Sequence, residues 1–94
     1  MFDLEKLPKT VQICGLTFEV VLSEVSDFQN LDHIGELWYN ELQIRILKTS
    51  SPEVQKSTLL HEIVEAWNMI YEMNLSHKTI TTLENALYQF LKFN

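Results

Sequence analysis

The chain has 94 residues, of which 46% are hydrophobic and 21% are charged. This length and composition predict one small globular domain, residues 1–94, with a single hydrophobic core. The net charge is −6, and the seven Lys and Arg residues are scattered singly, which argues against the concentrated basic surface that nucleic-acid binding requires.

No apolar run approaches the roughly 20 residues of a membrane span, and the N-terminus shows no signal-peptide pattern. We therefore expect a cytoplasmic protein that binds neither membrane nor nucleic acid. An acidic surface instead suits solubility or a basic protein partner, and less well the mimicry of nucleic acid, because the acidic residues do not form a dense run. The oligomeric state does not follow from the sequence.

The first half of the chain has the residue pattern of short β-strands. Residues 10–13 and 16–22 are rich in Val, Ile, Thr and Phe and are separated by Cys14-Gly15, which predicts a hairpin. Residues 33–39 and 42–47 predict a second hairpin around Asn40-Glu41. We expect four strands in a small antiparallel, meander-like sheet, preceded by an arm over residues 1–9.

The second half predicts two helices, so that the fold class is α+β with a four-stranded sheet followed by two packed helices. Ser51, Pro52 and Glu53 form a favourable helix start, and this helix should extend to about Met73. Ser76 can cap a second helix that extends to about Lys92. Its apolar stripe consists of Ile80, Leu83, Leu87 and Phe90 or Leu91.

The first helix carries the residues with the clearest chemical potential. At 100° per residue, His61 and Glu65 lie on one side, opposite an apolar stripe, so that both side chains can reach one metal ion. Imidazole and carboxylate both suit zinc. Glu62 lies 100° around the helix from His61, where a carboxylate could activate water at that metal.

The alternative interpretation is an ordinary solvated helix face, because a histidine and several acids opposite an apolar stripe are common. Two ligands do not make a stable zinc site, so a third ligand must come from elsewhere in the chain. The candidates are His77, Thr81 and Glu84 on or near the second helix, and His33 in the sheet.

Three segments resemble a family of small phage-encoded zincin-like proteins, which are related to metallopeptidases. They are IGELWYNELQIRI in the second hairpin, SSPEVQ before the first helix, and TLLHEIVEAW within it. The chain's last segment also follows the family pattern. The resemblance implies a minimal zincin-like fold.

The resemblance also implies roles for individual residues. The family's first zinc ligand corresponds to His61 and its general base to Glu62. Its second histidine ligand corresponds to Glu65, and its third ligand, a glutamate, falls on Thr81 in an ungapped placement, with Glu84 almost one turn further along. The HExxH motif is therefore altered to HExxE, and the metal-ligand set that we predict is His61, Glu65 and Glu84.

This altered motif leads to two functional predictions. The first is a non-catalytic phage accessory protein that uses a zincin-like scaffold to bind a protein partner, with Trp38 or Tyr39 as possible anchors or simply as packing residues of the sheet. The alternative is a zinc-dependent metallopeptidase in which Glu62 is the catalytic base. Zinc is the one cofactor that the pattern suggests.

Overall fold

A computed structural model describes residues 6–94, so the predicted N-terminal arm lies partly outside the described residues. Strands β1 (Thr10–Ile13), β2 (Leu16–Ser23), β3 (Gly35–Trp38) and β4 (Gln43–Leu47) come first, with a short 3₁₀ helix, Val25–Asp27, after β2. Helices α1 (Pro52–Ile70) and α2 (His77–Phe93) follow. The predicted α+β class, with four strands before two helices, is confirmed.

The four strands form one mixed sheet in the order β1-β2-β4-β3. The two hairpins are antiparallel as predicted, but β2 pairs in parallel with β4, and the expectation of an antiparallel meander is wrong for this pair. The reason is burial: Ile44 and Ile46 of β4 are both 0% exposed. The more apolar strand of the second hairpin therefore takes the inner position, and β3 becomes an edge strand.

Both predicted helix starts are confirmed. Ser51 accepts a hydrogen bond from the Val54 amide, and Ser76 accepts one from the Thr79 amide, so each serine satisfies a backbone N–H that the first helical turn leaves free. The first helix ends at Ile70 rather than near Met73. Glu72 and Asn74 have φ angles of 52° and 57°, and a right-handed helix does not continue through such residues.

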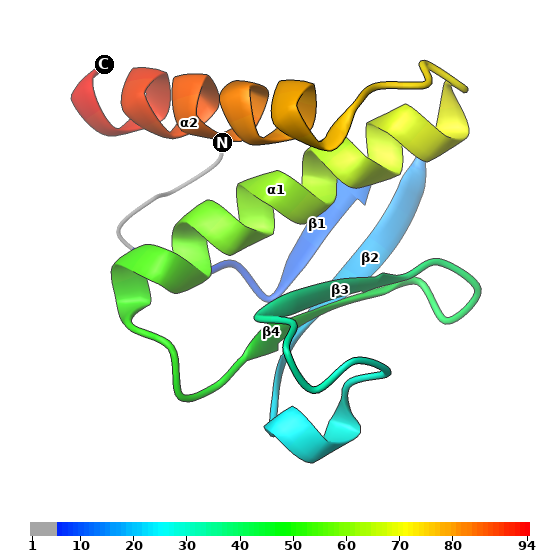
Figure 1. Ribbon diagram of the computed structural model, residues 1–94, viewed down its shortest axis with the longest axis vertical. Coiled ribbons are helices and arrows are strands. Elements are labelled where there is room, and N and C mark those ends of the chain that lie inside the picture. Colours follow the sequence, from blue (N-terminus) through cyan, green and yellow to red (C-terminus); the bar gives the residue numbers. More distant parts are fainter. Residues whose placement is uncertain (1–5) are drawn as a thin grey trace.

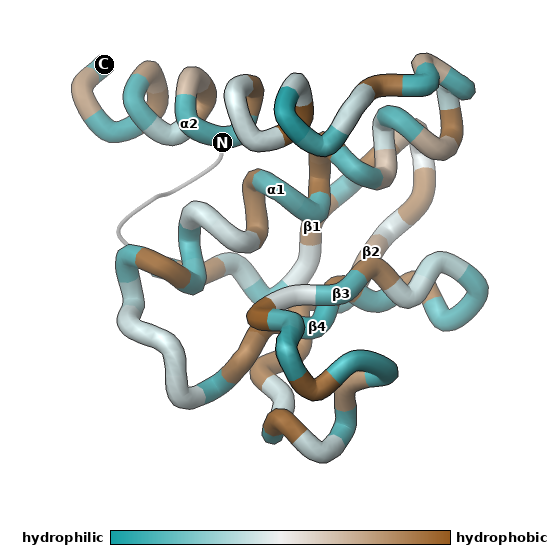
Figure 2. The backbone as a smooth tube through the Cα atoms, in the orientation of Figure 1, coloured by the Kyte–Doolittle hydropathy of each residue, from teal (hydrophilic) through white to brown (hydrophobic). Residues whose placement is uncertain are grey.

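Helix α1 lies across one face of the sheet, and α2 packs against α1 (Figure 1). This position buries α1 on more than the predicted apolar stripe, because Thr58 and Glu62 are also buried. Figure 2 shows hydrophobic and hydrophilic residues alternating around the turns of α2, as expected for a helix with one covered side.

The hydrophobic core lies between the sheet and α1. Its members come from three strands and from α1 and are all at most 7% exposed: Ile13, Phe18, Ile44, Ile46, Leu59, Leu60, Ile63 and Ala66. Leu87, Tyr88 and Leu91 of α2 pack on its margin. Within residues 6–94, no helix combines the length and apolar character needed to cross a membrane.

Candidate metal and active site

The imidazole of His61 contacts the carboxylate of Glu84, which lies on helix α2. Its Nδ1 atom lies 2.8 Å from Oε1 of Glu84, and the two side chains are only 19% and 15% exposed. The other oxygen of Glu84 accepts a hydrogen bond from the hydroxyl of Ser57, which lies one turn before His61 on α1. Because an ionised carboxylate only accepts hydrogen bonds, Nδ1 of His61 is the donor in this contact.

A second imidazole lies beside the first. The rings of His61 and His77 have their centroids 5.7 Å apart and are tilted by 58°. His77 is the first residue of α2, and its side chain is exposed. The turn between the helices therefore brings together two histidines that are sixteen positions apart in the sequence.

Glu62 is buried and has an unusual protonation equilibrium. Its side chain is 6% exposed, and no side-chain hydrogen bond within the described residues contributes to its protonation equilibrium. Burial, together with repulsion from Glu65, Glu36 and Glu84, raises the pKa of Glu62 to about 8. The carboxyl group is thus largely protonated at neutral pH when no cation is nearby.

Glu62 is buried because β3 approaches α1 closely at Gly35. A Cβ atom on Gly35 would lie 2.3 Å from Cγ2 of Thr58 and 3.1 Å from Oε2 of Glu62. Only glycine permits this approach, which covers the flank of α1 between the apolar stripe and His61. The sequence pattern around Glu62 did not indicate this contact.

Two cavities meet at these side chains and share Gly35, His61, Glu62 and His77. The smaller has a volume of about 250 Å³ and is also lined by Ile34, Thr58, Thr81 and Glu84. The larger has a volume of about 490 Å³ and reaches Glu65, Asn68 and Met69 on α1 and Gln29, His33, Glu36 and Leu37 near β3. The structure therefore places accessible space, lined by histidine and glutamate side chains, beside the HExxE motif.

The structure brings the predicted site residues to these two cavities. His61, Glu62 and His77 line both, Glu65 lines the larger one, and Thr81 and Glu84 line the smaller one from α2. His33 is engaged elsewhere, because its Nδ1 atom lies 2.7 Å from Oε2 of Glu36. Of the third-ligand candidates, His77 and Glu84 are the two whose side chains reach His61.

The carboxylate of Glu36, on β3, is held by hydrogen bonds within the domain. It accepts hydrogen bonds from the backbone amides of Gln29 and Asn30 and from the indole of Trp38, in addition to its contact with His33. Burial alone would raise the pKa of Glu36, but these hydrogen bonds lower it below its usual value. Glu36 therefore fixes the loop that forms one wall of the larger cavity.

The two aromatic side chains considered as partner anchors are used within the domain. The Trp38 ring is half-buried and lies 3.7 Å from the guanidinium of Arg45. Tyr39 packs near Phe18, with 6.0 Å between ring centroids. The contacts match the alternative that these residues stabilise the sheet.

The donor types around His61 suit zinc, because they comprise imidazoles and carboxylates. Among residues 6–94, no three His, Cys, Asp or Glu side chains are already arranged around a common point for a metal ion. No side-chain hydrogen bond within the described residues involves His77 or Glu65. The residue types around His61 therefore suit zinc, but binding an ion would require side chains to move to a common point.

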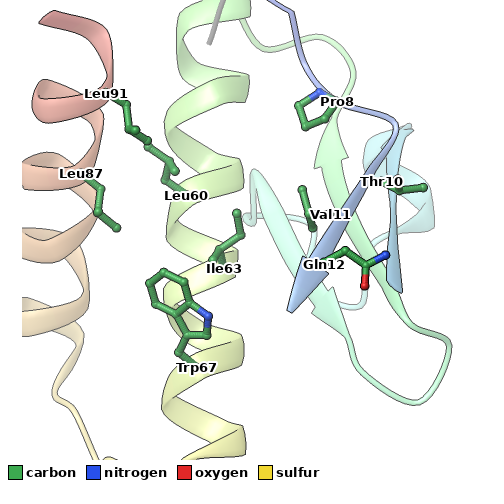
Figure 3. Close-up of a pocket in the computed structure, with 9 residues that line it drawn as sticks. All are labelled: Pro8, Thr10, Val11, Gln12, Leu60, Ile63, Trp67, Leu87 and Leu91. Carbon is green, nitrogen blue, oxygen red and sulfur yellow. The ribbon is translucent and has the colours of Figure 1, made fainter. Parts of the chain in front are cut away.

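A third cavity, of about 460 Å³, lies on the other side of α1. Leu60, Ile63 and Trp67 of α1, Leu87 and Leu91 of α2 and the β1 segment line it (Figure 3). Its walls are mostly apolar, with Thr10 and Gln12 as the polar members, and carry no ionisable side chain. Of these three cavities, the two around His61 are the ones lined by ionisable side chains.

No protein-family model matches this chain, and comparisons with curated proteins and with solved structures also found no match.

Proposed function

We propose that this domain binds one zinc ion through His61, Glu65 and His77 and uses it to hydrolyse peptide bonds. The observation that carries the proposal is the position of the His77 ring beside the His61 ring, 5.7 Å away between centroids. His77 supplies the second imidazole that the HExxE motif lacks. Two imidazoles and one carboxylate form a ligand set of catalytic zinc sites, which keep a fourth position open.

Glu62 is the residue placed to accept a proton in this site. Glu62 lines both cavities, so its carboxyl group is accessible from the site. A bound zinc ion supplies Lewis acidity and activates water. A nearby cation also favours the ionised form of a carboxyl group, which would convert Glu62 from an acid that keeps its proton into a base.

An extended peptide is the substrate class that best fits the cavity walls. Strand β3 pairs only with β4, so its other edge has backbone groups without a strand partner in the described sheet. Gly35, Glu36 and Leu37 of β3 line the larger cavity beside His61 and Glu62. An extended peptide can add to such an edge through main-chain hydrogen bonds. The family resemblance of the HExxE helix supports the same reaction class.

Metal content and peptide cleavage test this proposal together. Wild-type protein purified without chelator should carry about one zinc ion per chain and cleave unstructured peptides, as followed by mass spectrometry. Glu62→Gln should keep the zinc and lose most of the cleavage, since one general base contributes about 10²–10⁴-fold. Equal cleavage by Glu62→Gln, or a wild-type protein that takes up no zinc, would refute the hydrolase.

A non-catalytic protein-binding domain on the same scaffold, as an accessory factor of a phage acting in the host cell, is the second candidate. The observation that favours it is exposed apolar surface at the rim of the site: Ile34 is 48% exposed and Met69 is 45% exposed, and each lines one of the two cavities around His61. Zinc binding without cleavage of any peptide, combined with unchanged biological activity of Glu62→Gln, would favour this candidate.

A further inference from the structure

We infer that Glu84 is a positioning residue for His61: its carboxylate holds the ring with the proton on Nδ1 and thereby leaves Nε2 as the nitrogen that can bind a metal ion. This inference rests on the proposed zinc site and assigns Glu84 a different role from the ligand role that the sequence predicts. It begins from the 2.8 Å contact between Nδ1 of His61 and Oε1 of Glu84.

Both oxygens of the Glu84 carboxylate are already engaged. Oε1 faces His61, and Oε2 accepts the hydrogen bond from the Ser57 hydroxyl. A direct metal ligand would have to give up at least one of these contacts. Glu65 has no such contact with another described residue, which makes it the better placed carboxylate for the ion itself.

The geometry fixes the protonation pattern of the imidazole. A neutral imidazole carries one proton, and the nitrogen without it has the lone pair that binds metal. Because Glu84 takes a hydrogen bond at Nδ1, the lone pair is at Nε2. Histidine ligands in metal sites commonly donate their other N–H to a carboxylate in this way, which orients the ring and makes it a stronger ligand.

Burial strengthens the hydrogen bond between His61 and Glu84. His61 and Glu84 are 19% and 15% exposed, so water competes weakly for the hydrogen bond. Ser57 and His61 are four positions apart and therefore lie on the same side of α1. Glu84 on α2 meets both, so that two helices determine the orientation of a single ring.

The experiment compares wild type, Glu84→Ala and Glu84→Gln with Thr81→Ala, which alters a residue that lines the same cavity without contacting Glu84 through a hydrogen bond. In metal-free protein, ¹⁵N NMR of the imidazole nitrogens reports which one carries the proton. The wild type and Thr81→Ala should show the Nδ1–H form of His61. Glu84→Ala should shift to the Nε2–H form that a free imidazole prefers.

Zinc affinity, measured by competition with a chelating dye, is the second readout. Glu84→Ala should weaken binding by about 10–100-fold, the usual effect of removing such a partner. Glu84→Gln should weaken it less, because an amide oxygen still accepts from Nδ1, and Thr81→Ala should bind as the wild type does. Glu84→Ala should unfold at a somewhat lower temperature than the control, because the Ser57 hydroxyl and Nδ1 of His61 lose their acceptor, and Glu84→Gln should unfold closer to the control.

Two results would overturn the positioning role: an Nε2–H form of His61 in the wild type, or wild-type zinc affinity in Glu84→Ala. Failure of the wild type to bind zinc would instead refute the proposed function. In that case the NMR measurement on metal-free protein still decides whether Glu84 sets the proton position on His61.

Discussion

Glu62 differs from the other carboxyl groups of the site because it is buried beside three other carboxyl groups and no hydrogen bond within the described residues lowers its pKa. Glu84 and Glu36, by contrast, are each held by several donors. A buried acid with no donor favours its neutral form, whereas an acid that accepts hydrogen bonds favours its charged form. Two kinds of carboxyl group therefore lie within one small site.

The buried position of Glu62 predicts a pH-dependent stability in the presence of a chelator. Its pKa is about 8 in the folded chain, against an ordinary value of 4.5. Between these values the unfolded chain loses the proton and the folded chain keeps it, so the free energy of unfolding should fall as the pH rises. The slope is at most about 1.4 kcal/mol per pH unit.

Chemical denaturation of the wild type and Glu62→Gln between about pH 5 and pH 8 measures this effect. Glutamine has no proton to lose, so the variant should show a clearly flatter dependence. An identical decline in both proteins would place the titrating group elsewhere. The chelator is essential, because a bound cation would favour the ionised carboxyl and alter the dependence.

Gly35 predicts a steric effect at the contact between β3 and α1. Gly35→Ala places a methyl group 2.3 Å from Cγ2 of Thr58, which requires one element to shift. We expect a loss of about 1–3 kcal/mol in the free energy of unfolding, as for other overpacked contacts. Thr58→Ser removes Cγ2, so the double variant should recover part of the loss.

A double-mutant cycle with denaturant unfolding measures this coupling. Gly15→Ala is the matched control, because a Cβ atom there would contact nothing within 4 Å and the cost comes only from the φ angle of 79°. The loss in free energy of unfolding caused by Gly15→Ala should therefore be the same with Thr58 as with Thr58→Ser. Strict additivity of Gly35→Ala and Thr58→Ser would contradict the close contact.

At the scale of the elements, the end of α1 is a point of backbone strain. Glu72 follows the cap residue Tyr71, has a φ of 52° and is exposed. Glycine is the preferred residue in this conformation after a helix, and a negative charge is unfavourable near a helix C-terminus. Glu72→Gly should therefore raise the free energy of unfolding by up to about 1 kcal/mol.

Thermal unfolding of Glu72→Gly and Glu72→Ala separates the effect of backbone strain from the effect of the negative charge. Alanine removes the charge but leaves the strained conformation, so its melting temperature should lie below that of the glycine variant. A glycine variant no more stable than the alanine variant would show that the backbone at Glu72 is not strained.

The local pattern of the sequence predicted most element positions but not their arrangement. Alternating residues and the serine caps marked four strands and two helix starts, because those signals are local. The pairing of β2 with β4 depends on which strand of the second hairpin is more apolar. That property emerges only when β3 and β4 are compared with each other, so the pattern within either strand does not predict it. Strand β4 begins at Gln43 rather than at Leu42 because Leu42 has a φ of 52°. Leucine rarely adopts a positive φ, so the sequence gives no sign of this conformation.

At the scale of the whole molecule, the site is assembled from parts that the sequence showed only separately. The spacing of the HExxE motif correctly placed His61 and Glu65 on one helix. It did not predict the burial of Glu62, which comes from β3 at Gly35, far away in the sequence. Nor could it choose among the third-ligand candidates, because the turn between the helices and their packing determine which side chains reach His61.

The proposed zinc site requires His61 and His77 to bind one metal ion together. Zinc bound after equilibrium dialysis, measured by inductively coupled plasma mass spectrometry, tests it with three histidine variants. His33 is the matched control, because it lines the larger cavity but contacts Glu36. The wild type and His33→Ala should retain about one zinc ion per chain, and His61→Ala and His77→Ala should each lose it. Zinc retained in full by His77→Ala would contradict this requirement.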